Sequence, residues 1–310
     1  MLLTYIRDNL REEEHEGYVY SFSKGFLSKA KTSEPFYLRS CAKPLQAALL
    51  IEHDVIDKYG FTSEEIALCC ASHTGDEEHL KVANSILKKT GLNINNLKCG
   101  IHPPLSEKMR KKLADLNQEP TVLHNNCSGK HLMFLSVTKL NNWDIETYDE
   151  LTHPVQQEAA RIISSLCETN VKNYPITTDG CGVPIFSMPL KNIVTGFINL
   201  FTNQKYEQIK NAILEFPIIA GGENRLDTTI IQNGKNNLIA KVGAGGLCVV
   251  VNLKEKDAFI VKINDCFENA RKIVVFETLK RLGWADIPYD RTIKTLSGKV
   301  VGNIVTDLLI

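Results

Sequence analysis

Hydrophobic and polar positions change their spacing twice along the chain. The first forty residues hold two short strand-like runs, YVYSF at 18–22 and PFYLRS at 35–40. From Lys43 to about Phe216, apolar residues recur at the spacing of amphipathic helices. Runs rich in β-branched residues return after that point. The pattern therefore predicts strands at both ends of the chain and helices between them.

Seven segments carry the helical spacing. In 79–91, Leu80, Ala83, Ile86 and Leu87 share one face, and Gly91 is suited to end the helix. The seven predicted helices span residues 44–56, 79–91, 129–140, 155–167, 190–201, 206–216 and 268–283.

Two hairpins are expected in the last third of the chain. The first spans 228–243 and turns at Asn233-Gly234, and the second spans 247–263 and turns at Lys254–Asp257. The predicted fold class is α/β (α+β), with one mostly antiparallel sheet built from both chain ends, flanked by helices, and an inserted helical subdomain. We expect a single unit, 1–310, in which 1–42 and 217–310 form the sheet-containing lobe and 43–216 the mainly helical lobe. A functional site is expected in the cleft between the lobes.

Charge and composition exclude several classes of function. Lys plus Arg and Asp plus Glu both number 36, so nothing favours nucleic acid or an acidic membrane as a partner. Acidic residues follow the N-terminus too early for a signal peptide, and no run of about 18 uncharged apolar residues is present. We therefore expect a cytoplasmic protein with reduced thiols.

Most of the nine scattered cysteines are interpreted as small core residues: Cys41, Cys69, Cys70, Cys99, Cys167, Cys248 and Cys266.

A serine and a lysine three positions apart precede the first helix, in LRSCAKPLQAALL at 38–50. The same tetrad occurs five times, so its spacing alone does not identify a catalytic pair. Pro44 is tolerated in the first turn of a helix, which places Ser40 and Lys43 at the helix entry. A helix N-terminus stabilises an oxyanion and lowers the pKa of a nearby lysine. Ser40 is therefore a candidate nucleophile with Lys43 as its base, and a helix cap is the alternative role.

Two further segments combine hydroxyl, imidazole and thiol groups. In CCASHTGDEEH at 69–79, Ser72 and His73 follow an apolar helix, and His73 is interpreted as a loop residue near a site rather than a metal ligand. HNNCSGKH at 124–131 is more polar than a helix cap requires. A thiol dyad of Cys127 and His131, four residues apart on one helix face, remains open.

Three glycine-containing segments complete the candidate chemistry. TTDGCGVPIF at 177–186 presents Asp179 and Cys181, and Cys181 sharing a metal ion with Cys127 is a further alternative. GGENRLDTT at 221–229 is polar and begins with glycine. LIAKVGAGG at 238–246 ends a predicted strand in Lys-Val-Gly, which is loosely similar to the Lys-Thr-Gly motif of serine β-lactamases.

Taken in order, these segments resemble the rhizobial-type L-asparaginases, the asparaginase II family. Eight blocks fit: EHEG, RSCAKPLQA, ASHTGDEEH, HNNCSGKH, TTDGCGVP, GGENRLDT, KVGAGG and GKVVGNI. They span nearly the whole chain, which makes the resemblance far more specific than one tetrad. The family is similar in fold to serine β-lactamases and glutaminases, in agreement with the predicted order of strands and helices.

The resemblance implies an L-asparaginase that releases aspartate and ammonia from L-asparagine and forms a homodimer. It implies one serine–lysine pair of Ser40 and Lys43 and a second of Ser72 and Lys241. It also implies a zinc site of Cys127, Lys130 and Cys181 with Asp179 nearby, where zinc supports rather than performs the chemical step. An acidic residue is expected where Gly245 stands. The candidate substrate-binding residues are Arg39, His73, Asn126, Glu223, Asn224 and Arg225.

Two other functions remain open at this stage. A glutaminase or a penicillin-recognising enzyme of the same fold would use the same serine chemistry. A non-catalytic protein that binds zinc or an amino acid would need Ser40 only as a helix cap.

Overall fold

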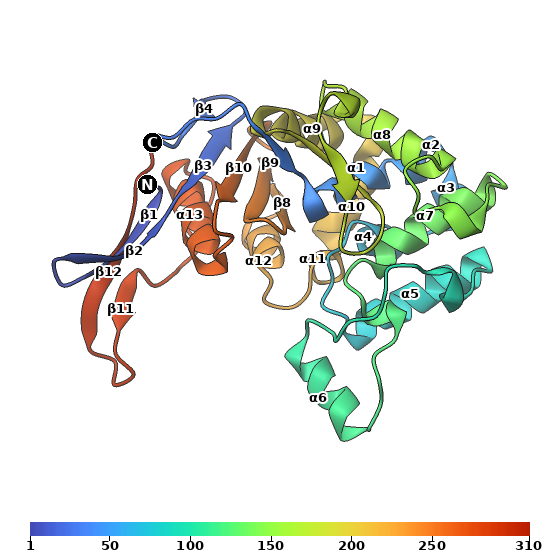
Figure 1. The fold of residues 1–310 in the computed structure, drawn as a ribbon, viewed down its shortest axis with the longest axis horizontal. Coiled ribbons are helices and arrows are strands. Elements are labelled where there is room, and N and C mark those ends of the chain that lie inside the picture. The colour runs from blue at the N-terminus through green and yellow to red at the C-terminus, as the bar shows by residue number, and fades with distance from the viewer.

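The computed structural model describes residues 1–310. Its centre is a five-stranded antiparallel sheet with the order β4-β3-β10-β9-β8. Figure 1 shows the blue N-terminal strands beside the orange C-terminal ones, as the sequence pattern predicts. The five strands are β3 (Gly17–Ser21), β4 (Gly25–Phe26), β8 (Leu238–Gly243), β9 (Leu247–Asn252) and β10 (Asp257–Ile263).

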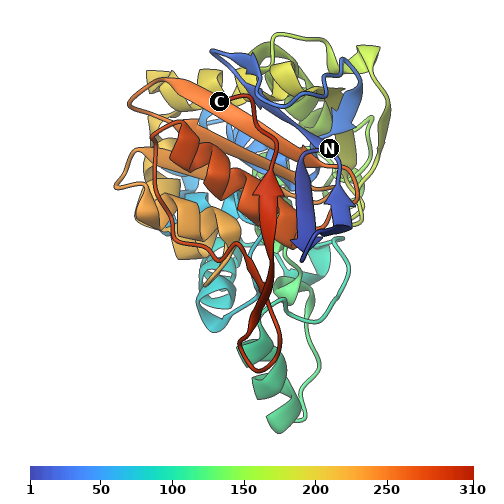
Figure 2. The same ribbon diagram turned by 90° about the vertical axis from the view of Figure 1, so that its left-hand side faces the viewer.

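Helices cover both faces of this sheet. Every residue of β8 and β9 is buried, which is typical of strands that pack on both sides. α13 (Glu268–Arg281) packs on β9 and β10, and α9 (Leu190–Thr202) packs on β3, β9 and β10. In Figure 2, α13 lies in front of the orange strands and the helical lobe lies behind them.

The helical lobe is built around α7, whose residues are almost all buried. No helix of the protein is long and apolar enough to cross a membrane. The remaining α-helices are α1 (Ala42–Ala47), α2 (Leu49–Glu52), α3 (Val55–Tyr59), α4 (Ser63–Cys69), α5 (Glu77–Thr90), α6 (Glu107–Asp115), α7 (Ser128–Leu140), α8 (Pro154–Leu166), α10 (Glu207–Glu215), α11 (Pro217–Ala220) and α12 (Leu226–Asn233). Short 3-10 helices are η1 (Arg39–Cys41), η2 (Ile94–Asn96), η3 (Val122–His124), η4 (Ile145–Thr147), η5 (Val171–Asn173) and η6 (Gln204–Tyr206).

Two smaller sheets complete the fold. A three-stranded sheet joins β5 (Pro35–Tyr37), β7 (Pro184–Pro189) and β6 (Ile176–Thr178). A four-stranded sheet joins the two chain ends and extends away from the body (Figure 1). Its strands are β11 (Thr292–Lys294), β12 (Val300–Thr306), β1 (Leu3–Arg7) and β2 (Leu10–His15).

The predicted fold class is confirmed, because antiparallel sheets from both chain ends flank a mainly helical middle. Gly91 ends α5 in the left-handed conformation with φ of 63°, as expected. The second predicted hairpin is the β9–β10 pair. The helix predicted over 44–56 is divided among α1, α2 and α3.

Two details of the prediction are wrong. The hairpin over 228–243 does not form, because 226–233 is the helix α12, which buries Ile230 and Ile231 and leads into β8. Cys266 is exposed rather than in the core, and it has a φ of 64° in the turn before α13.

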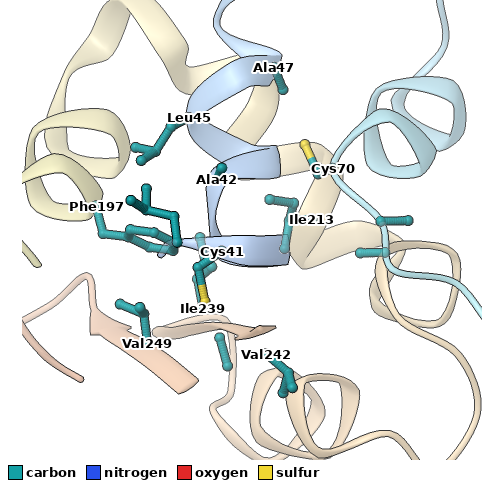
Figure 3. Packing of buried hydrophobic residues seen from close by; sticks show 14 of the residues in the cluster. Cys41, Ala42, Leu45, Ala47, Cys70, Phe197, Ile213, Ile239, Val242 and Val249 are labelled. Atoms are coloured by element: carbon teal, nitrogen blue, oxygen red, sulfur yellow. The ribbon is translucent and has the colours of Figure 1, made fainter. Parts of the chain in front are cut away.

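Close packing joins η1 to β8, the two elements that carry Ser40 and Lys241. The Cys41 thiol donates a hydrogen bond to the carbonyl oxygen of Lys241 at 3.4 Å. In Figure 3, Cys41 lies beside Phe197 and next to Ile239 of the strand, and Ala42 lies on the other side of Cys41 from the strand. A Cβ atom on Gly243 would lie 2.9 Å from Cys41 Sγ, so this contact requires glycine.

Candidate active site

Ser40 lies where the chain leaves β5 and enters the first helix. Arg39, directly before it, has a φ of 47°, in the left-handed region that a non-glycine residue rarely adopts. Such strain is often found at functional sites. Ser40 is half-buried and its hydroxyl makes no hydrogen bond within the protein. Pro44 lies in the first turn of α1, as predicted.

The hydroxyl of Ser72 lies between two buried lysines. Lys43 Nζ is 3.0 Å from Ser72 Oγ, and Lys241 Nζ is 3.1 Å from the same oxygen. Lys43 also donates to the carbonyl oxygens of Ala71 at 2.7 Å and Asn126 at 3.0 Å. The structure therefore brings three of the four predicted catalytic residues into direct contact, and Lys43 contacts Ser72 rather than Ser40.

The surroundings of the two lysines differ in charge. Burial lowers the pKa of Lys43 to about 8; the neighbouring Cys127 opposes this shift, and the charges of Lys130 and Lys241 add to it. About a tenth of Lys43 is then neutral at pH 7. Lys241, in contrast, has the carboxylate of Asp227 at 3.4 Å.

Asp227 is a buried carboxylate that sequence reasoning missed. It is only 2 % exposed, accepts the backbone N–H of Val242 at 3.4 Å and lies beside Lys241. A buried carboxylate needs partners of this kind. Its signal in the sequence is an acidic residue at the start of the amphipathic stretch 226–233, which the sequence analysis divided between a polar segment, 221–229, and the incorrect hairpin that begins at residue 228.

A cluster of two thiols and an amine lies next to the serine–lysine group. Lys130 Nζ is 3.0 Å from Cys181 Sγ, and Asp179 Oδ2 is 3.9 Å from Lys130. The interaction with Cys181 holds the pKa of Cys127 well below its usual value, and Lys43 and Lys130 add to this effect against the cost of burial. Burial alone would lower the pKa of Lys130, but the two thiols and Asp179 raise it overall.

These residues are chemically suited to a soft divalent cation. No three His, Cys, Asp or Glu side chains in the protein are clustered as metal ligands. Cys127 and Cys181 are nevertheless buried together, and thiolates are favoured zinc ligands. Lys130 would join them only as a neutral amine, since its ammonium now donates to Cys181. The two thiols and, once neutral, the amine of Lys130 are side-chain donors of a kind that suits zinc.

His131 does not form the thiol dyad that the sequence left open. His131 Nδ1 is 2.6 Å from the hydroxyl of Tyr148, and the thiol of Cys127 donates to Asn126 Oδ1 at 3.3 Å. His73 is fully buried, shares a hydrogen bond with Ser128 Oγ at 2.9 Å and accepts the N–H of Gly75 at 3.1 Å. His73 thus shapes the loop that carries Ser72.

The other predicted substrate-binding residues divide into two groups. Arg39 Nε is 2.9 Å from Asp179 Oδ1, and Asn126 supplies the carbonyl that Lys43 contacts, so both lie at the site. Glu223, Asn224 and Arg225 make no contact with the serine–lysine residues; they line separate depressions on the surface.

A mixed α/β fold with a serine between two buried lysines defines a protein equipped for nucleophilic catalysis. The sequence model of the family described as L-asparaginase II matches residues 3–305. The chain therefore belongs to the L-asparaginase II family, and this membership supports a hydrolase of the L-asparaginase type.

No curated protein matches the chain. Among solved structures, a β-lactamase from Mycobacterium bovis is 14 % identical with a TM-score of 0.44, covering 86 % of this chain and 93 % of the other. A putative β-lactamase from Bacteroides dorei is 12 % identical with a TM-score of 0.43, covering 90 % of this chain and 92 % of the other.

Proposed function

We propose that the chain is an L-asparaginase that hydrolyses the side-chain amide of L-asparagine to L-aspartate and ammonia. Family membership supports the reaction. The observation that carries the proposal is the position of Ser72 Oγ, within 3.1 Å of the amines of both Lys43 and Lys241. Such a network moves protons without requiring a histidine base.

Ser40 is the proposed nucleophile. Its hydroxyl makes no hydrogen bond within the protein, and the residue is half-buried in η1. Neutral Lys43 takes its proton, and the oxygen attacks the amide carbon of asparagine. A backbone N–H group at the helix entry, that of Ser40 itself, is proposed to hold the oxyanion of the tetrahedral intermediate, since those of Cys41 and Ala42 donate within the protein.

Ser72 and Lys241 serve as the proposed proton relay. The proton on Lys43 passes through the Ser72 hydroxyl to the leaving nitrogen, so that ammonia departs and an ester on Ser40 remains. Water then attacks this ester, and the same relay accepts and returns one proton as aspartate leaves. Asp227 orients Lys241, since its carboxylate accepts from that amine.

Zinc is proposed to support this site. Cys127, Lys130 and Cys181 would hold it, with Asp179 nearby, and its charge would stabilise a bound anion. Asp179 links the cluster to Arg39, next to the nucleophile, through an ion pair of 2.9 Å. A homodimer and a cytoplasmic location remain predictions from the sequence.

An ammonia-release assay with asparagine, glutamine and a chromogenic β-lactam tests the proposal. We expect asparagine to be hydrolysed far better than glutamine, although one methylene alone provides discrimination of only about 1–3 kcal/mol. Ser40→Ala should abolish release, and mass spectrometry of a trapped intermediate should locate the adduct on Ser40. An adduct on Ser72 or Cys127 would contradict the assignment. Tight binding of asparagine without ammonia release would indicate a binding protein instead.

A further inference from the structure

A depression of about 300 Å³ lies where the first turns of α12 and α13 meet the end of β8. Val242 lines it, whereas none of the four proposed catalytic residues does. Successive side chains on a strand point to opposite faces, so Val242 faces away from the cluster that holds Lys241. The depression is therefore separate from the candidate active site.

Positive charge dominates this depression, and much of it is unpaired. Its charged lining residues are Arg225, Arg271, Lys272 and Glu268. The side chain of Arg225 makes no hydrogen bond or ion pair, and its Nε atom is buried. Lys272 has no carboxylate partner and stands over the ring of Phe276 at 5.9 Å.

Arg271 provides a second buried donor without an acceptor. This side chain is only 6 % exposed, and its Nε atom has no hydrogen-bond partner. Its Nη1 atom donates to the carbonyl oxygen of Gly243 at 3.0 Å, and its Nη2 atom lies 3.4 Å from Glu268, whose side chain is 79 % exposed. A buried donor left unpaired is costly, so two such guanidinium groups in one depression indicate a missing acceptor.

Two helix N-termini strengthen the case for an anion. α12 and α13 are 8 and 14 residues long, and the residue before each helix makes no side-chain capping bond, although Asp227 accepts the N–H of Thr228 in α12 at 3.3 Å. Uncapped first turns present free N–H groups and the positive end of the helix dipole. Their convergence on the same depression as two guanidinium groups whose Nε atoms lack a partner favours a negatively charged ligand.

We propose that this depression binds a small carboxylate. Guanidinium groups pair with carboxylates through two parallel hydrogen bonds, as they also do with phosphate, and the comparison with phosphate below distinguishes the two anions. The proposal does not depend on the reaction at Ser40. Binding would nevertheless affect the position of η1, which carries Ser40. Arg271 donates a hydrogen bond to the carbonyl oxygen of Gly243, and Gly243 packs against Cys41 in η1.

Calorimetric titration with succinate tests the proposal. We expect the wild-type protein to bind succinate, and Arg225→Gln and Lys272→Gln each to weaken binding about tenfold, as the loss of one charge-assisted contact predicts. Arg161→Gln, which removes an exposed arginine on α8, should bind like the wild type. Ser72→Ala should also keep its affinity. Both Arg225 and Lys272 lie at the surface, and circular dichroism would confirm that the variants are folded.

Three results would overturn the proposal. The first is no binding to the wild type at about 10 mM succinate. The second is unchanged affinity in Arg225→Gln and Lys272→Gln, with loss in Ser72→Ala, which would place the carboxylate among the serine–lysine residues. The third is inorganic phosphate binding as tightly as succinate, which would reveal a general anion site.

Discussion

Raising the pH from 6 to 10 titrates the buried amine of Lys43, whose neutral form is the proposed base. Burial lowers the pKa of this amine to about 8, from a usual value of 10.5. About a tenth of Lys43 is then neutral at pH 7 and about nine tenths at pH 9. We therefore expect kcat to rise about tenfold between pH 7 and pH 9 and to level off above pH 9.

The assay is ammonia release at saturating asparagine. Under saturation kcat reports the enzyme–substrate complex, which avoids titration of the α-amino group of free asparagine. A rate that climbs tenfold per pH unit up to pH 10 would mean that Lys43 keeps an ordinary pKa and would refute the reasoning. Lys43→Arg is the matched control, because a guanidinium remains charged and should be inactive at every pH.

Three further predictions follow from the same contacts. Ser72→Ala should lower kcat about a hundredfold or more without unfolding the protein, measured by ammonia release and circular dichroism. Gly243→Ala should lower the free energy of unfolding by about 1–3 kcal/mol and lower kcat, because the added Cβ displaces η1. Gly245→Ala is the control: its added Cβ meets no atom within 4 Å, so kcat should be preserved despite the positive φ of Gly245. Cys127→Ser and Cys181→Ser should each remove zinc, measured by elemental analysis, and raise KM for asparagine while some turnover remains. The control Cys248→Ser should retain the metal. Absence of metal from wild-type protein purified without chelator would contradict this prediction.

Much of the fold could be predicted because the spacing of apolar residues in a segment indicates which face of that segment is buried. The helices α5, α8, α9 and α10 each bury one apolar face, which gives a period near 3.6 residues that the sequence displays. The hairpin of β9 and β10 is equally local, with two apolar runs and a charged turn. These elements depend little on distant parts of the chain.

The prediction failed where distant contacts decide the structure. The stretch 226–233 contains two threonines and two isoleucines, which favour strands, yet it forms α12 against β8. Leu226 and Ile230 are also four residues apart, the spacing of a helix, so periodicity left both structures open. Tertiary packing of Ile230 and Ile231 settles the choice.

The side-chain contacts within the candidate active site could not be predicted from local sequence either. Ser72 and Lys241 are 169 positions apart, and the sequence around either residue does not indicate that Ser72 Oγ and Lys241 Nζ lie 3.1 Å apart. Only the order of the motifs, through the family resemblance, joined them. The contact between Lys43 and Ser72 was not predicted at all, because the spacing of Lys43 from Ser40 suggested a local pair.

That unpredicted contact constrains the proposed mechanism. A neutral Lys43 that donates its two N–H groups to the carbonyl oxygens of Ala71 and Asn126 has one lone pair left. This lone pair accepts from one hydroxyl at a time, so it serves either Ser72 or Ser40. Proton transfer from Ser40 therefore requires the Ser72 hydroxyl to turn away from Lys43. Lys241 is 3.1 Å from the same oxygen and donates to it, which holds Ser72 in place while its proton is redirected to the leaving nitrogen.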